Sequence, residues 1–222
     1  TIVKERIVSN NQQLLRVDYE DIDSYRTLEK SAVVSKIISK IDNVDSILIS
    51  DYAKGLINKE IINCVKKHSK NKPIIVDPKP VNIDLYKDLT LVTPNLKEAK
   101  EIANKKTLKE IGETLISKLN SNILITKGSD GMSLFNKDSN SIDFPTIAKE
   151  VIDISGAGDT VISTIALALT STTLNQSVIL ANHAASIVIS KFGTATVSQK
   201  ELIATLSQDN NKVKSVNELV KI

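Results

Sequence analysis

The chain has 222 residues, with 29 lysines and arginines against 26 aspartates and glutamates, and one cysteine, Cys64. Its net charge of +3 is spread along the chain without a basic block, which disfavours a nucleic-acid partner. Cys64 has no second cysteine to pair with, and this fits a reducing compartment. No apolar stretch reaches the about 18 residues of a membrane-spanning helix. We therefore expect a cytoplasmic protein without a membrane partner, built around one α/β domain.

The first segment with a strand pattern is a pair of short strands over residues 1–8 and 12–17, joined by a polar turn at 9–11. Neither strand is apolar enough for the centre of a sheet, so the pattern predicts a two-stranded edge or lid. From Leu28 the pattern changes, and apolar residues up to Ile41 recur at helical spacing.

Compact apolar runs then alternate with helical segments. Because the runs are nearly continuous, they predict parallel strands covered on both faces, joined by right-handed crossovers. The expected strands are Ile47–Ile49, Ile74–Val76, Leu89–Val92 and Ile123–Ile125, followed by an antiparallel pair at Gly131–Phe135 and Ser141–Pro145. The expected helices are Lys59–His68, segments within Leu96–Leu119, Ala157–Leu169, Leu174–Phe192 and, with a weaker pattern, Glu201–Leu206.

The most informative motif lies in residues 151–160, where a turn of small residues, Gly156–Gly158, is followed by Asp159 and an apolar run. This layout is typical of an anion-binding turn at a helix N-terminus, because glycine permits a tight turn and the first N–H groups have no intrahelical partner. A carboxylate beside such a turn suits phosphoryl transfer to an alcohol. The alternative interpretation is an ordinary helix start that contains an aspartate.

Polar residues also follow each expected parallel strand. Ligands of open α/β sheets bind outside the carboxyl ends of the strands, so four such loops favour a nucleotide site. Each loop alone is equally compatible with a turn or a helix cap. The sequence contains neither a Walker-type loop nor a G-x-G-x-x-G motif. The loops are Ser50–Gly55, Asp77–Pro80, Thr93–Glu98 and Thr126–Gly131.

Asn95 and Glu98 are candidates for a magnesium site. They stand three residues apart at a predicted helix start, so their side chains project from nearly the same face. An amide and a carboxylate suit Mg²⁺, which keeps several waters and contacts few protein ligands. The alternative is an ordinary first turn, where the helix dipole favours a glutamate.

These motifs resemble those of the ribokinase-like, phosphofructokinase-B-type sugar kinases. Residues 153–159 are similar to the second signature of this family, residues 95–98 to its N-x-x-E motif for magnesium and phosphate, and residues 126–131 to its nucleotide loop. Further segments resemble the kinases of heptose 7-phosphate, which make ADP-heptose precursors of bacterial lipopolysaccharide. These segments are Asn11–Arg16, Ser50–Gly55, Asp77–Lys79 and Lys191–Ser198.

The resemblance implies a three-layer α/β fold with a mostly parallel sheet, a partial β lid at residues 1–20 and a nucleotide-binding and catalytic domain at residues 21–222. It implies a bacterial, cytoplasmic enzyme that transfers a phosphoryl group from ATP, with Mg²⁺, to the anomeric hydroxyl of D-glycero-β-D-manno-heptose 7-phosphate. It also implies a homodimer in the complete enzyme.

The resemblance further implies roles for individual residues. Asp159 would be the base, and Gly156, Ala157 and Gly158 would donate N–H groups to the transferred phosphoryl group. Asp51 and Lys54 would bind the sugar, and Asn95 and Glu98 would organise Mg²⁺, mostly through water. The nucleotide would be bound by Lys79, Asn95, Leu96, Lys97, Glu98, Thr126, Lys127, Gly128, Gly131 and Asn182.

Two departures from the family pattern lead to a further expectation. The chain shows neither the family's initial Gly-rich sugar-binding segment nor the H-x-G-H motif of a fused adenylyltransferase. We expect the nucleotide half of the site to be complete and the sugar half to be partly missing, so that this chain alone binds adenine nucleotide weakly and does not phosphorylate heptose 7-phosphate. The alternatives are a kinase for another sugar or a vitamin precursor, and a non-catalytic nucleotide-binding module.

Overall fold

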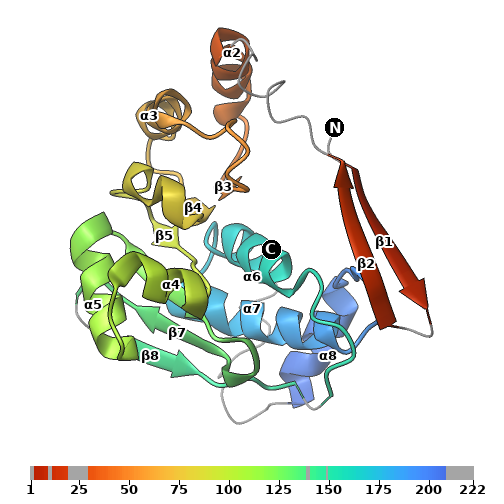
Figure 1. Ribbon diagram of the computed structural model, residues 1–222. Coiled ribbons are helices and arrows are strands. Elements are labelled where there is room, and N and C mark those ends of the chain that lie inside the picture. Colours follow the sequence, from red (N-terminus) through yellow and green to blue (C-terminus); the bar gives the residue numbers. More distant parts are fainter. Residues whose placement is uncertain (1–2, 10–11, 20–29, 139–140, 149, 209–222) are drawn as a thin grey trace.

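The computed structural model describes residues 3–9, 12–19, 30–138, 141–148 and 150–208. It begins with an antiparallel hairpin of β1 (Val3–Ser9) and β2 (Gln12–Tyr19), at the positions where the sequence predicts two strands. Ser9, expected in the turn, is the last residue of β1; the rest of that turn lies outside the described residues. Figure 1 shows the hairpin as an arm that stands apart from the main sheet, on the side of β3.

The main sheet has six strands in the order β3-β4-β5-β6-β7-β8. The first four are parallel and the last two antiparallel, which confirms the predicted mostly parallel sheet. The predicted strand at Leu89–Val92 is shorter than expected, because Leu89 instead donates its N–H to the Ser121 hydroxyl. The strands are β3 (Ile47–Ser50), β4 (Ile74–Asp77), β5 (Leu91–Val92), β6 (Asn122–Thr126), β7 (Met132–Phe135) and β8 (Ser141–Phe144).

The helices follow the predicted pattern closely. The region Leu96–Leu119 divides into two helices, because Asn104 adopts a left-handed conformation with φ of 50° and Thr107 caps the next helix. The helices are α2 (Lys30–Ile41), α3 (Lys59–His68), α4 (Leu96–Ala103), α5 (Leu108–Leu119), α6 (Ala157–Ala168), α7 (Leu174–Ile189) and α8 (Gln199–Gln208). Two short 3₁₀ helices are η1 (Pro80–Leu85) and η2 (Gly128–Asp130).

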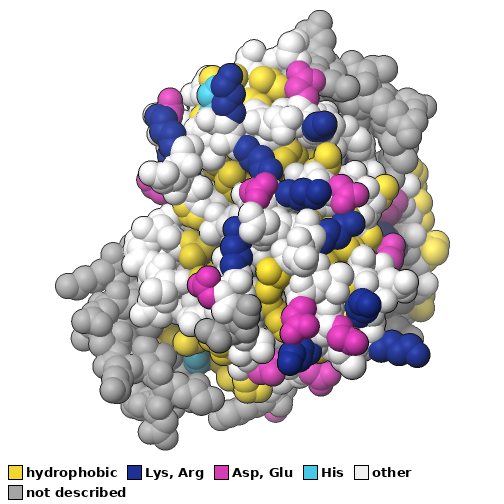
Figure 2. All heavy atoms as spheres, turned by 90° about the vertical axis from the view of Figure 1, so that its left-hand side faces the viewer, with side chains coloured by type: hydrophobic (Ala, Val, Ile, Leu, Met, Phe, Trp, Pro, Cys, Tyr) yellow, Lys and Arg dark blue, Asp and Glu magenta, His cyan; other side chains and the backbone are white. Residues whose placement is uncertain are grey.

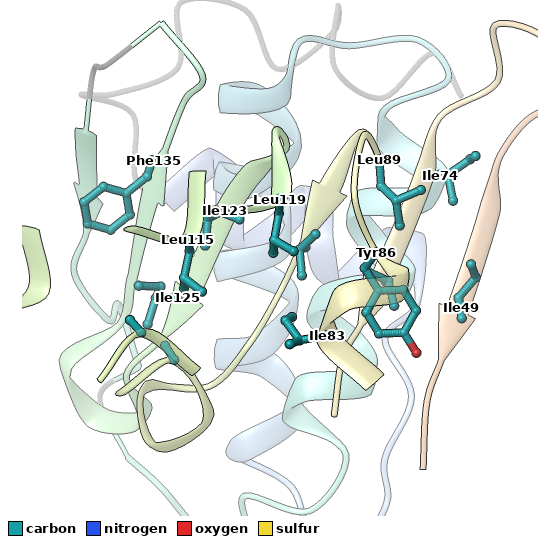
Figure 3. Close-up of a cluster of buried hydrophobic side chains, with 14 of the residues drawn as sticks. Ile49, Ile74, Ile83, Tyr86, Leu89, Leu115, Leu119, Ile123, Ile125 and Phe135 are labelled. Carbon is teal, nitrogen blue, oxygen red and sulfur yellow. The ribbon is translucent and has the colours of Figure 1, made fainter. Parts of the chain in front are cut away.

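The sheet lies between two helical layers, which confirms the three-layer expectation. Ile74 and Val76 of β4 pack on one face with residues of α3, α4 and α5, whereas Ile75 packs on the other face with residues of α6 and α7. This alternation follows from the two-residue period of a strand. Figure 3 shows the first of these clusters, with the Tyr86 ring inside it and its hydroxyl oxygen pointing away from the other labelled side chains.

The surface shows no segregation of charge on the face drawn in Figure 2, where lysines and arginines are interspersed with aspartates and glutamates. Cys64 is buried in α3. Within the described ranges, no helix has the length and apolar character needed to cross a membrane.

Candidate active site

The carboxyl ends of the parallel strands bring the predicted loops to one edge of the sheet. Three backbone hydrogen bonds join neighbouring loops there: Asp51 N–H to Asp77 O at 3.1 Å, Thr93 N–H to Val76 O at 2.9 Å, and Thr126 N–H to Pro94 O at 3.1 Å. A parallel bridge also joins Asn95 to Thr126. The loops that the sequence identifies separately therefore form one continuous rim.

Asp51 anchors the first loop of this rim. The residue is 1% exposed, and its carboxylate accepts hydrogen bonds from Tyr86 Oη at 2.7 Å, Asn82 Nδ2 at 2.9 Å and the Ala53 N–H at 2.7 Å. Ala53 has a φ of 54°, a left-handed conformation that costs an alanine roughly 1–2 kcal/mol and persists where surrounding bonds fix it. Asp51, expected to bind sugar, thus holds the shape of the loop that carries Lys54.

Lys79 and Glu98 connect the second and third loops. Lys79 Nζ lies 2.6 Å from Glu98 Oε1. The other carboxylate oxygen of Glu98 accepts the Asn95 N–H at 3.1 Å, while Asn95 Oδ1 accepts the Glu98 N–H at 3.0 Å, which is a capping box at the start of α4. Both predicted magnesium ligands, Asn95 and Glu98, therefore already form hydrogen bonds that cap α4. Glu98 also forms an ion pair with Lys79.

Asp77 is the last residue of β4, and several charged groups of the rim affect its pKa. Burial raises the pKa of Asp77 to about 6; the positive charge of Lys79 acts against this rise, and the negative charges of Glu98, Asp159 and Asp51 add to it. The influence of Asp159 on this pKa places the α6 turn and the rim in one electrostatic environment. The negative charge of these carboxylates favours a cation near the rim.

The turn before α6 has the geometry expected for an anion site. Gly156 is the N-cap residue with a φ of 81°, and no side chain caps the helix there. Ala157 and Gly158 stand in the first turn, where helices leave N–H donors without intrahelical acceptors, but the Ala157 N–H already donates to the Ile154 carbonyl at 3.2 Å. Asp159 is exposed in the same turn. Asp153 fixes the approach to the turn by accepting the N–H groups of Ser155 at 2.8 Å and Gly193 at 3.1 Å.

The predicted nucleotide loop follows β6. Its backbone turns sharply at Gly128 and Gly131, with φ of 61° and 80°. At Gly131 a side chain would collide with the carbonyl oxygen of Phe144, so this position requires glycine for packing as well as conformation. Lys127 Nζ lies 3.1 Å from Asp143 Oδ1. The same carboxylate oxygen accepts a hydrogen bond from the Ser133 hydroxyl.

The remaining predicted nucleotide residues occupy different settings. Leu96, the first residue of α4, packs against the hydrophobic core, whereas Lys97 is exposed. Asn182 lies on α7 and donates its Nδ2 to the Pro145 carbonyl at 2.8 Å, just beyond β8. The structure therefore gathers Lys79, Asn95, Glu98 and Thr126. It also connects Asn182 to Pro145, whose backbone lies against Gly131 of the loop after β6.

Sequence reasoning missed Asn82 and Tyr86, the two side chains that hold Asp51. Both belong to η1 or its C-cap, which has no apolar period to reveal it. The sequence offers one signal for Tyr86, which is that large aromatic residues are scarce in this chain, with 4 tyrosines and no tryptophan. Polar tips of buried tyrosines usually find a partner, but the sequence does not say which.

A metal at this rim would need water as a ligand. Among the residues that the structure describes, no three His, Cys, Asp or Glu side chains gather closely enough to hold a metal ion. The nearby Asp77 and Glu98 carboxylates and the Asn95 amide supply oxygen atoms, which is the donor chemistry that Mg²⁺ prefers, with several waters retained. The donor set therefore fits a hydrated Mg²⁺.

Comparison with known proteins identifies the family. Residues 1–201 match the model of the pfkB family of carbohydrate kinases. The bifunctional protein HldE of Shewanella sediminis is 39% identical over 96% of this chain and 45% of its own length. An uncharacterized sugar kinase of Buchnera aphidicola is 41% identical over 93% of this chain and 67% of its own length. The chain thus spans about half of the length of the first relative and about two thirds of the length of the second.

Solved structures show the same fold. The ribokinase of Thermotoga maritima superimposes with a TM-score of 0.72 at 23% identity, over 87% of this chain and 66% of that one. Arabidopsis thaliana ribokinase, solved with ribose and ATP, gives a TM-score of 0.67 at 24% identity over 77% of this chain and 58% of that one. With a ribokinase-like fold and a family model that covers most of its length, the chain belongs to the pfkB family of carbohydrate kinases.

Proposed function

We propose that this site transfers the γ-phosphoryl group of ATP to the anomeric hydroxyl of D-glycero-β-D-manno-heptose 7-phosphate, a step toward ADP-heptose for lipopolysaccharide. The observation that carries the proposal is the exposed Asp159 in the uncapped first turn of α6, whose charge reaches Asp77 at the rim of the sheet. This combines a base with backbone donors for negative charge, which is what phosphoryl transfer to an alcohol requires.

Asp159 would take the proton of the attacking hydroxyl. The N–H groups at Gly156, Ala157 and Gly158 would stabilise the negative charge on the transferred group, because the first turn of α6 supplies donors and the positive end of a helix dipole. The exposure of Asp159 supports this role, since it leaves the carboxylate accessible to a substrate.

The rim would bind the nucleotide and its metal. Lys79, held by Glu98, offers a positive charge for the phosphates, and Asn95 and Glu98 would orient a hydrated Mg²⁺. Magnesium would supply charge neutralisation of the phosphate oxygens. The adenosine would lie along the loop after β6, and we assign the remaining nucleotide contacts to Leu96, Lys97, Thr126, Lys127, Gly128, Gly131 and Asn182.

The heptose assignment is supported by the loop Ser50–Gly55 and by the similarity to HldE proteins. The sugar would lie beside Lys54, on the loop that Asp51 shapes. We also propose a homodimer in the cytoplasm, with residues 1–20 as a lid over the domain of residues 21–222. Support for the dimer comes from the apolar face of the hairpin, where Val3, Ile7, Leu15 and Tyr19 are each about half exposed or more, at 46–57%.

The test is product analysis by ³¹P nuclear magnetic resonance with MgATP and heptose 7-phosphate, on the chain with the family's Gly-rich sugar-binding segment supplied. The proposal predicts ADP and a sugar with a second phosphate on its anomeric carbon. Ribose and fructose 6-phosphate serve as comparison acceptors. Faster transfer to another acceptor would make the chain a kinase of the same family with a different substrate, and nucleotide binding without transfer to any acceptor would favour a binding module.

A further inference from the structure

The loop Lys127–Gly131 after β6 is closed by its own backbone. The Lys127 N–H donates to the Gly131 carbonyl at 2.8 Å, and the Gly131 N–H donates to the Gly128 carbonyl at 3.1 Å. Gly128 and Gly131 both have positive φ, which lets the chain turn back over this short stretch. These bonds give the loop its shape, and its position on the sheet depends on contacts with other elements.

The C-terminal end of the loop lies on the segment that follows β8. A Cβ added at Gly131 would collide with the Phe144 carbonyl oxygen and would lie 2.7 Å from the Thr146 nitrogen, so the backbone of Gly131 packs directly on this segment. Helix α7 holds the same segment, because Asn182 Nδ2 donates to the Pro145 carbonyl at 2.8 Å. The segment after β8 therefore supports one end of the loop.

The N-terminal end of the loop is joined to β8 by an ion pair. Lys127 Nζ lies 3.1 Å from Asp143 Oδ1, and the Ser133 hydroxyl donates to the same oxygen. Ser133 and Asp143 are cross-strand partners in the β7–β8 pair, so the carboxylate is fixed by the residue opposite it. The hydrogen bonds from Ser133 and then from Lys127 lower the pKa of Asp143, and they favour its charged form.

The two partners of this ion pair are covered to different extents. The Lys127 side chain is 14% exposed, whereas the Asp143 side chain is 73% exposed. Covering an ammonium group costs free energy unless an acceptor or an opposite charge compensates for it. Asp143 supplies this compensation, so the direction of the Lys127 side chain toward β8 depends on a residue that is itself mostly exposed.

We propose that Asp143 is a positioning residue for nucleotide binding, which acts through Lys127 and fixes the loop after β6 on the end of β8. The Lys127 ammonium then serves the ion pair, and the loop receives the adenosine with its backbone. This inference rests on the proposed function, because it assigns a role within the nucleotide part of the same site. It adds β8 to the elements that shape this site.

The loop and the rim would contact different parts of the nucleotide. In the proposed site Lys79 and Glu98 lie near the phosphates and Mg²⁺, and the loop lies along the adenosine. A loop that is fixed in advance binds more tightly, because less conformational freedom is lost on binding. Loss of the Asp143 charge should therefore weaken nucleotide binding and leave its dependence on Mg²⁺ unchanged.

The test is titration calorimetry of the chain with a non-hydrolysable ATP analogue and Mg²⁺. Asp143→Asn is expected to weaken binding of the analogue about three- to tenfold, between the effect of breaking an exposed ion pair and that of breaking a buried one. The Mg²⁺ concentration that gives half of the gain in affinity should stay at the wild-type value. Asp143→Glu, which keeps the charge, should restore most of the affinity.

A double-mutant cycle with Lys127→Met shows whether Asp143 acts through Lys127. In the Lys127→Met chain, Asp143→Asn should cause no further loss of affinity, because the ion pair is already absent. Asp138→Asn is the matched control, since it removes an exposed carboxylate from the connection between β7 and β8.

The positioning role would be overturned by an unchanged affinity in Asp143→Asn, by equal losses in Asp143→Asn and Asp138→Asn, or by losses from Asp143→Asn and Lys127→Met that add. A shifted Mg²⁺ dependence in Asp143→Asn would also overturn it, because the substitution would then disturb the whole site. If the wild-type chain binds no analogue, the proposed function fails and this role fails with it. Wild-type binding that Asp143→Asn leaves unchanged removes this role alone.

Discussion

Lys79 and Glu98, which stand 19 positions apart, meet through a 2.6 Å contact between Nζ and Oε1 across two loops of the sheet edge. Glu98 is the more buried partner, with its side chain 11% exposed against 33% for Lys79. The same carboxylate closes the capping box of α4. Glu98, at the start of α4, therefore fixes the position of Lys79. Because Glu98 is also a proposed Mg²⁺ residue, a change at Glu98 should affect both the proposed phosphate contact and the proposed metal site.

Glu98→Gln tests this coupling. Glutamine keeps an oxygen for the Asn95 N–H but removes the charge that holds Lys79 and would orient a hydrated Mg²⁺. We expect the Mg²⁺ concentration for half-maximal ADP release to rise several-fold. Glu110→Gln, which makes the same change in the capping box of α5, serves as the control for damage to a capping box. An unchanged Mg²⁺ dependence in Glu98→Gln would leave the residue with a role in the helix start alone.

Asp159→Asn is expected to slow phosphoryl transfer by about 10²–10⁴-fold, the usual loss for a general base, with little change in nucleotide affinity. The fold should be retained, because the side chain is exposed. Single-turnover ADP release, with the family's Gly-rich sugar-binding segment supplied and the chain in excess over ATP, measures the rate. Asp138→Asn, also exposed, controls for loss of a surface charge. Transfer at near the wild-type rate would remove Asp159 from the role of base.

The raised pKa of Asp77 gives a pH dependence of stability. Its pKa is about 6 in the folded protein and about 3.9 in an unfolded chain. Between about pH 4 and pH 6 the folded state therefore holds more protons than the unfolded state, and the free energy of unfolding falls as pH rises through this window. The stabilisation is present below about pH 4 and lost above about pH 6.

Asp77→Asn should remove this dependence and raise the free energy of unfolding at pH 7, relative to wild type, by about 1–2 kcal/mol after allowance for solvent screening of a half-buried group. Urea denaturation at pH 4.5 and pH 7 measures the difference. Parallel behaviour of the variant and the wild type at the two pH values would show that Asp77 is ionised throughout the window.

Gly131→Ala and Gly128→Ala form a matched pair in the loop after β6. Both residues have positive φ, but a Cβ at Gly131 meets the Phe144 carbonyl whereas a Cβ at Gly128 meets nothing within 4 Å. Gly128→Ala should cost about 1–2 kcal/mol from conformation alone. Gly131→Ala should cost clearly more and disturb the β7–β8 pair. Thermal unfolding of both variants gives the comparison, and equal losses would contradict the packing argument.

Much of the fold can be predicted from the sequence, because the sequence patterns that indicate each strand and helix are local. The near-continuous apolar run at Ile74–Val76 indicates a strand covered on both faces, and Ile75 is fully buried against one helical layer while its neighbours face the other. The break within Leu96–Leu119 was also expected from the pattern, but its position at Asn104 depends on a left-handed residue that has no periodic signal.

The candidate site can be predicted from the sequence only in part. The polar residues after each strand indicate which edge of the sheet carries it, because parallel strands end on the same side. The bonds within the site join distant positions, as in the hydrogen bond between Tyr86 and Asp51, and depend on side-chain direction in three dimensions. The orientation of the hairpin, with Lys4 over Tyr52, likewise follows from packing that no local pattern encodes.

The central claim is that the rim of the sheet and the α6 turn together bind a magnesium nucleotide. Titration calorimetry of the chain with a non-hydrolysable ATP analogue, with and without Mg²⁺, tests it most directly. The account predicts saturable binding of one nucleotide per chain that strengthens with Mg²⁺ and weakens in Lys79→Met. Absence of binding in both conditions, or binding that neither Mg²⁺ nor Lys79→Met alters, would contradict it.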